Sequence, residues 1–108
     1  IIHTKKFIEK KSESSNILLT EISYATLLNF TALYEYNSSE YNKSIEYYEK
    51  SLEIKKAKNV NNLVNSDIAD SLNSIGKVYQ KKGDYEKTLE YYKKSYDIRI
   101  EVFKNNPN

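Results

Sequence analysis

Residues 69–95, with the sequence ADSLNSIGKVYQKKGDYEKTLEYYKKS, decide the fold of this chain. In the first half of the stretch, apolar side chains recur at spacings of three and four, which predicts one helix face, at Leu72, Ile75, Val78 and Tyr79. Gly83 suits the left-handed residue that ends a helix, and Asp84 suits the N-cap of the next one. That second helix is predicted by another stripe, at Tyr85, Leu89, Tyr92, Tyr96 and Ile100. The first helix takes its N-cap from Asn65, Ser66 or Asp67.

The same plan occurs a second time, 44 residues earlier. Residues 25–59 align with residues 69–103 without a gap. The two segments are identical at 11 of these 35 positions, which in the earlier copy are Ala25, Leu28, Asn29, Tyr41, Lys43, Glu46, Tyr47, Tyr48, Lys50, Ser51 and Ile54. Self-similarity at a fixed period is the mark of a repeat protein. The chain is therefore predicted to contain a duplicated unit of two helices.

The repeat divides the chain into three segments. Residues 20–64 and 65–108 form two repeats, the second with an exit linker that contains Pro107, and residues 1–19 are expected to be a truncated second helix of a preceding repeat plus its linker. Two Gly and one Pro are too few for the turns of an all-β domain. We therefore expect an all-α fold of five helices in about two and a half repeats. Because the first residue is Ile1 rather than Met, we also expect a piece of a longer protein.

The pattern resembles the tetratricopeptide repeat. The residues that carry the resemblance are Ala69-x-x-Leu72-x-x-Ile75-Gly76-x-x-Tyr79, Gly83-Asp84-Tyr85 and Thr88-x-x-x-Tyr92-x-x-Ser95. A period of about 44 residues is more similar to the kinesin-light-chain type of this repeat than to the 34-residue type. The resemblance covers residues 20–104. It implies antiparallel helix pairs stacked as an α-solenoid, a right-handed superhelix whose first helices line a groove.

Several side chains have roles that the resemblance implies. Gly76 and Ala32 are small where the helices of one pair cross. Tyr41 and Tyr85 wedge the second helix against the first, and Tyr48 and Tyr92 fill the space between units. Four hydroxyl side chains stand where the family usually has alanine, and we expect each to bond to a carbonyl one turn back, namely Ser44, Ser51, Thr88 and Ser95.

One position departs from the pattern. Glu35 stands where the second unit has Tyr79. Either Tyr34 takes that role and the turn is one residue longer, or the first helix pair packs more loosely.

The groove is the expected functional site. Carried over by position, its residues are Thr26, Asn29, Phe30, Leu33 and Tyr36 in the first repeat, and Asp70, Asn73, Ser74, Lys77, Gln80 and Lys81 in the second. Asn29 and Asn73 occupy equivalent places, and their amides both donate and accept hydrogen bonds, as a peptide backbone requires. Lys77 and Lys81 lie one turn apart and suit an acidic ligand group. The alternative is a solvated polar face, on which the two asparagines are inherited by duplication.

Composition argues against several other functions. The chain has no Cys and one His, His3, so it lacks a thiol nucleophile and a cysteine metal site. A net charge of +2 is too small to indicate nucleic-acid binding. The tyrosines and lysines of Tyr91-Tyr92-Lys93-Lys94 are typical of a packed and solvated helix rather than a stacking platform. We expect no enzyme activity, no cofactor, no metal, no nucleic acid and no membrane contact, and a cytoplasmic location.

The predicted function is protein–protein interaction, with a peptide or partner domain held in the groove. Two alternatives stay open, a structural spacer within a longer solenoid and a sensor arm of a multidomain signalling protein. Terminal repeats normally need polar caps. The two ends here carry apolar side chains instead, so we also expect self-association end to end or marginal stability, through Ile1, Ile2, Phe7, Ile8, Ile98, Ile100, Val102 and Phe103.

Overall fold

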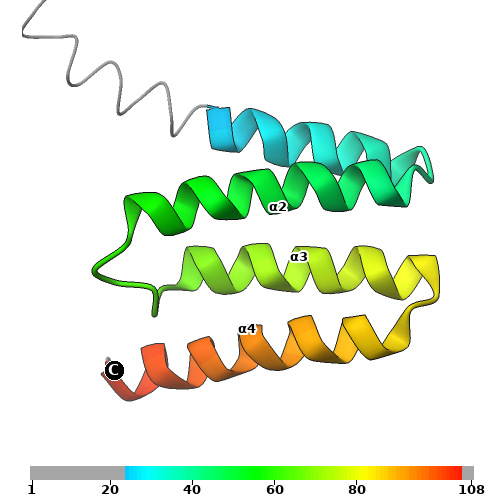
Figure 1. Cartoon of the computed structure of the whole chain (residues 1–108). Coiled ribbons are helices and arrows are strands. Elements are labelled where there is room, and N and C mark those ends of the chain that lie inside the picture. The colour runs from blue at the N-terminus through cyan, green and yellow to red at the C-terminus, as the bar shows by residue number, and fades with distance from the viewer. Residues whose placement is uncertain (1–23, 106–108) are drawn as a thin grey trace, which may run out of the picture.

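The computed structural model describes residues 24–105, and these residues form only helices and the turns between them. A first helix extends through residue 37 and is followed by α2 (Tyr41–Lys58), α3 (Ser66–Lys82) and α4 (Tyr85–Asn105). The four helices lie side by side in chain order as two antiparallel pairs (Figure 1). The all-α helix-pair architecture is therefore confirmed. The half-repeat expected at residues 1–19, and with it the fifth helix, lies outside the described residues.

Both helix pairs turn in the same way. Gly83 follows α3 with φ 92°, and Ser39, which lies 44 positions earlier, has φ 65°. In each turn the next amide N–H donates to the carbonyl five residues back, at 2.9 Å after Gly83 and at 2.8 Å after Ser39. This bond satisfies a carbonyl that the helix end leaves open. The two turns therefore have equal length and equal geometry.

Equal turns settle the position of Glu35. The longer turn that would bring Tyr34 into the place of Tyr79 does not form, and Tyr34 is exposed. In the second pair, Tyr79 stacks on Tyr91 with 5.5 Å between ring centroids. Glu35 cannot make that contact, so the first pair lacks this aromatic stack.

Replacing Ser39 by Gly is expected to stabilise the protein by about 1 kcal/mol. A side chain in the left-handed region is sterically disfavoured by roughly 1–2 kcal/mol, and the greater freedom of glycine in the unfolded chain offsets part of the gain. Urea unfolding measures the difference. The reciprocal change Gly83→Ser is the matched control and should destabilise by a similar amount. A loss of stability on Ser39→Gly would contradict this account.

Serine hydroxyls join the two helices of each pair. Ser51 Oγ donates to the Ala25 carbonyl at 3.1 Å, and at the equivalent place Ser95 Oγ donates to the Ala69 carbonyl at 2.8 Å. Ser44 Oγ likewise reaches across its pair, to the Ala32 carbonyl at 2.7 Å. The expectation of a carbonyl one turn back was wrong for these three residues. The expectation is confirmed for Thr88, whose hydroxyl donates to the Asp84 carbonyl, one turn back on the same helix.

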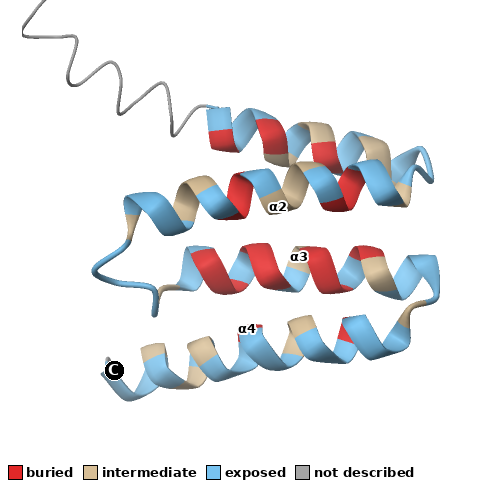
Figure 2. Cartoon of the chain, viewed as in Figure 1, coloured by how far each residue is buried: buried red, intermediate tan, exposed pale blue. Residues whose placement is uncertain are grey.

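The core lies between successive helices. Its buried cluster joins α2 and α3, and half-buried side chains from α2, α3 and α4 pack against it. Leu52, Ile68, Leu72 and Ile75 form the cluster, and Tyr48, Tyr79, Tyr91 and Ile98 surround it. Figure 2 shows that buried residues follow one another along α3. Tyr48 fills the space between units as expected, and its phenol hydrogen-bonds to Ser74.

The apolar stripe predicted on α4 is only partly buried. Tyr85, Leu89 and Tyr96 are all exposed, and the buried residues of α4 are Thr88 and Ser95. Small side chains face α3 because the two helices approach closely. Tyr85, Leu89 and Tyr96 of the stripe therefore point away from the pair, whereas the Tyr92 ring lies against Gly76 of α3. Tyr85 accordingly does not act as a wedge, unlike its repeat equivalent Tyr41, which is half-buried and meets Tyr36 edge-on at 6.0 Å.

Candidate peptide-binding groove

The predicted site residues lie on helix 24–37 and on α3. We call their shared surface the groove face, and it comprises Thr26, Asn29, Phe30, Leu33, Tyr36, Asp70, Asn73, Ser74, Lys77, Gln80 and Lys81. All of these side chains are exposed or half-exposed. The two helices place them at matching positions, because each repeat uses the opposite side of its first helix for packing. Three hollows open along this face.

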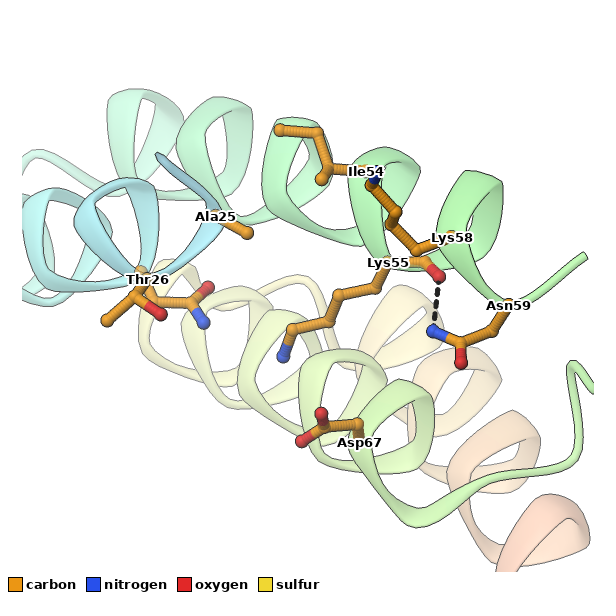
Figure 3. A pocket seen from close by; sticks show the side chains of 8 residues that line it. Ala25, Thr26, Ile54, Lys55, Lys58, Asn59 and Asp67 are labelled. Atoms are coloured by element: carbon orange, nitrogen blue, oxygen red, sulfur yellow. Dashed lines mark hydrogen bonds between the residues drawn. The ribbon is translucent and has the colours of Figure 1, made fainter. Parts of the chain in front are cut away.

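The first hollow has a volume of about 520 Å³ and includes Thr26 and Asn29. Its other walls come from the end of α2 and the start of α3, and the residues that complete it are Ala25, Ile54, Lys55, Lys58, Asn59 and Asp67. Figure 3 shows the Lys55 side chain extended from α2 toward α3, with Thr26 to one side and Asp67 to the other.

Lys55 is held in place by hydrogen bonds at both ends. Its Nζ donates to Ser71 Oγ at 2.9 Å, and its own carbonyl accepts from the Asn59 amide at 2.7 Å. The side chain is half-buried. Lys55 is therefore part of the contact between α2 and α3 rather than a solvated lysine at a helix end.

Two smaller hollows lie at the other end of the groove face. One, of about 180 Å³, is lined by Leu33, Tyr36, Tyr48, Ser74, Lys77 and Val78. The next, of about 320 Å³, is lined by Tyr36, Lys77, Gln80, Lys81 and Tyr85. Tyr36 and Lys77 border both, so the two hollows are adjacent. The side chains of both repeats meet here.

Three predicted residues line none of these hollows, namely Phe30, Asp70 and Asn73. Asp70 is ion-paired with Arg99 of α4, with 2.6 Å between Oδ1 and Nη2. Its carboxylate therefore helps to join α3 to α4. Phe30 and Asn73 are exposed.

The charge along the groove face is mainly positive. Lys55 and Lys58 border the first hollow, and Lys77 and Lys81 border the last. Asp67 is the acidic residue at the first hollow, while the carboxylate of Asp70 faces Arg99. Lysine side chains therefore border the row of hollows at both ends.

A fourth hollow, of about 480 Å³, lies away from the groove face between α2 and α4. Apolar residues of α2, the α2–α3 linker, α3 and α4 dominate its lining, among them Leu52, Leu63, Val64, Leu72 and Ile98. Tyr91 also borders it. Burial and then the charge of Glu49 raise the Tyr91 pKa from 10.0 to about 12. Tyr91 is therefore a neutral packing residue that donates to Glu49 Oε1 over 3.4 Å.

Sequence reasoning missed the α2 side of the first hollow. Lys55, Lys58 and Asn59 come from the end of α2, and Asp67 comes from the start of α3. Only the path of the linker between these helices brings them together. The signal in the sequence was the cluster of lysines before an asparagine-rich linker, which has no counterpart in the repeat pattern.

Some other features bear on function. Among residues 24–105, no group of three or more His, Cys, Asp or Glu side chains is placed to hold a metal ion. Within the same range, no helix combines the length and the apolar character that a membrane span needs.

The fold and the internal duplication define a helical-repeat protein. Two family models, both described as tetratricopeptide repeat, match residues 32–58 and residues 68–108. The chain belongs to the tetratricopeptide-repeat family, and the repeat at residues 68–108 is of the kinesin-light-chain-like type. Neither a curated protein nor a solved structure matches the chain significantly. The repeats imply an interaction module for protein partners. The boundaries 20–64 and 65–108 remain predictions.

Proposed function

We propose that residues 24–105 bind an acidic peptide segment of a partner protein along the groove face, without catalysing a reaction. The observation that carries this proposal is the row of hollows lined by helix 24–37 and α3 together. A peptide that follows this row contacts both repeats at once. Hollows of this kind suit side chains of a ligand, and the lysines at either end suit its carboxylates.

The groove face offers three kinds of contact to such a peptide. Leu33 and Tyr36 supply apolar surface at the two adjacent hollows. Lys77 and Lys81 provide charge for an acidic side chain or terminus. The amides of Asn29 and Asn73 provide paired donors and acceptors for the backbone, independent of its sequence. The ligand that fits best is an acidic segment with an aromatic or aliphatic side chain between its charges.

A peptide array that varies acidic and apolar content is expected to identify peptides that bind this chain. The double change Lys77→Ala with Lys81→Ala should lower the affinity for these peptides about tenfold. Removing two cations from one hollow removes charge-assisted hydrogen bonds to the ligand. Fluorescence anisotropy at low and moderate salt measures the affinity, and added salt should weaken binding to the parent chain most.

Lys93→Ala on α4 is the matched control, because it removes an exposed lysine that borders none of the hollows. It should leave the affinity unchanged. Asn29→Ala with Asn73→Ala should weaken acidic and neutral peptides alike. Binding that does not depend on peptide charge, or an equal loss on Lys93→Ala, would rule out this groove.

A second candidate is a structural spacer in a longer solenoid. It is supported by the exposed apolar face of α4, which resembles the face of α2 on which α3 packs. The sensor arm of a signalling protein and the cytoplasmic location remain predictions.

A further inference from the structure

The contact between α2 and α3 joins the two repeats. On α2, Ile45 and Leu52 are each 7% exposed, and Leu52 packs in the core cluster with residues of α3. On α3, the side chains that face this contact are almost completely buried. They include Ile68, Ser71, Ile75 and Val78. This contact is the way in which this chain places one repeat on the next.

α4 carries the same surface as α2, but among residues 24–105 no helix packs on it. Leu89 and Tyr96, which correspond to Ile45 and Leu52 by the 44-residue shift, are 70% and 64% exposed. Tyr85 and Phe103 extend this exposed face along α4. Figure 2 shows that the outer side of α4 is mainly exposed, in contrast to α3. The face is therefore a helix-docking surface without its helix.

Helix 24–37 carries the opposite surface. Tyr24, Leu27 and Tyr34 correspond to the buried Ile68, Ser71 and Val78 of α3, yet they are exposed. Leu27 alone is 61% exposed, against 4% for its equivalent. Residues 24–37 include a single charged residue, Glu35. A helix face so apolar is unusual for a surface in contact with water.

We infer that a second copy of this chain docks its helix 24–37 onto α4, in the manner in which α3 packs on α2. The exposed face of α4 is equivalent to the α2 side of the contact between the repeats, and the exposed face of helix 24–37 is equivalent to the α3 side. The larger Tyr96 replaces Leu52 on one side, and the smaller Thr31 replaces Ile75 on the other. Tyr24, Leu27 and Tyr34 are larger than their α3 equivalents and therefore add apolar area to the contact.

The polar side chains also permit this contact. In the α2–α3 contact, Lys55 donates to Ser71. Arg99 is the equivalent of Lys55 on α4, and it is already paired with Asp70 of its own repeat. Leu27 therefore replaces Ser71 without leaving a cation unpaired. Docking therefore places a paired rather than an unpaired cation beside Leu27.

The association is head-to-tail. Each copy uses α4 for one neighbour and helix 24–37 for the other, so the contact does not close on itself. The array grows with concentration rather than stopping at a symmetric dimer.

The test uses the full 108-residue chain in sedimentation velocity over a wide concentration range. The parent chain should give a mass that rises with concentration. Leu89→Glu and Leu27→Glu each place a charge in the contact, and each variant alone should be monomeric, with association weakened by more than about tenfold. Both positions are exposed, so both variants should keep the helical circular dichroism of the parent.

The decisive measurement is a mixture of the two variants. The Leu89→Glu chain keeps an intact helix 24–37, and the Leu27→Glu chain keeps an intact α4. The mixture should therefore form a heterodimer and grow no further. Asn42→Glu, an exposed change elsewhere on α2, should associate like the parent. A parent chain that is monomeric throughout, or a mixture without heterodimer, would overturn the inference. Association that depends on Leu89 but not on Leu27 would also overturn it, and would point to a different helix as the occupant of α4.

Discussion

Ile75→Ala is expected to lower the free energy of unfolding by about 2–5 kcal/mol, which is the usual range for removing a large aliphatic side chain from a core. Ile75 is fully buried in the cluster with Leu52, Ile68 and Leu72. That cluster joins the two repeats, so a cavity there weakens the contact on which both depend. In a domain whose total stability is typically 5–15 kcal/mol, the loss should shift the urea midpoint strongly.

The matched control for this change is Thr31→Ala. Thr31 holds the place of Ile75 in the first repeat, but it is half-exposed, and its hydroxyl donates to the Leu27 carbonyl of its own helix. Its removal should change the unfolding free energy by less than about 0.5 kcal/mol. Unfolding should be measured at a protein concentration low enough to exclude association. Equal losses for the two variants would contradict the assignment of the core to the contact between repeats.

The local features of this fold could be predicted from the sequence because they depend on neighbouring residues. Asn65 Oδ1 accepts from the Ile68 amide at 2.9 Å, and Asp84 Oδ1 accepts from the Lys87 amide at 3.2 Å. Both caps were among the predicted candidates. Gly83 has the left-handed conformation expected of it. The 44-residue period also predicted that Ser51 and Ser95 would be equivalent, and they bond to equivalent carbonyls.

Features that depend on the neighbouring helix could not be predicted in this way. Periodicity identifies an apolar stripe on α4 but does not say whether another helix covers it. The stripe with Leu89 and Tyr96 is a packing face in the repeat pattern, yet it is exposed in this chain. Likewise, the hydroxyl of Ser44 is compatible with a carbonyl on its own helix or on the partner helix. Only the distance between the two helices decides in favour of Ala32.

The candidate site likewise has residues that could be predicted from the repeat pattern and residues that could not. The repeat pattern placed Thr26, Asn29, Tyr36 and Lys77 on helix 24–37 and α3, where they border the hollows. It could not predict Lys55, because the first hollow also needs the end of α2. A pattern that describes one repeat does not describe a site built between two repeats.

Gly76→Leu is expected to lower the free energy of unfolding by about 3 kcal/mol, the upper part of the usual range for overpacking. A Cβ atom at Gly76 would lie 2.7 Å from two ring carbons of Tyr92. That ring is also held by its hydroxyl, which donates to Gln80 Oε1 at 3.1 Å. Gly76→Ala should have a much smaller effect, because the gain in helix propensity of about 1 kcal/mol offsets part of the clash. Asn73→Leu places the same side chain on an exposed position of α3 and should stay within about 0.5 kcal/mol.

The Tyr92 ring can be tested as the cause by a double-mutant cycle. Tyr92→Ala removes the ring that a larger side chain at position 76 would strike, so Gly76→Leu should be less damaging in that background, with a coupling of about 1–3 kcal/mol. Ala32, the repeat equivalent of Gly76, is fully buried, so the first pair accepts a Cβ at this crossing. Additive losses would mean that the backbone approach limits this position, because the Thr88 carbonyl oxygen lies 3.4 Å from the same Cβ site. The Tyr92 ring therefore makes the closest contact with this position, and the cycle measures the energy of that contact directly.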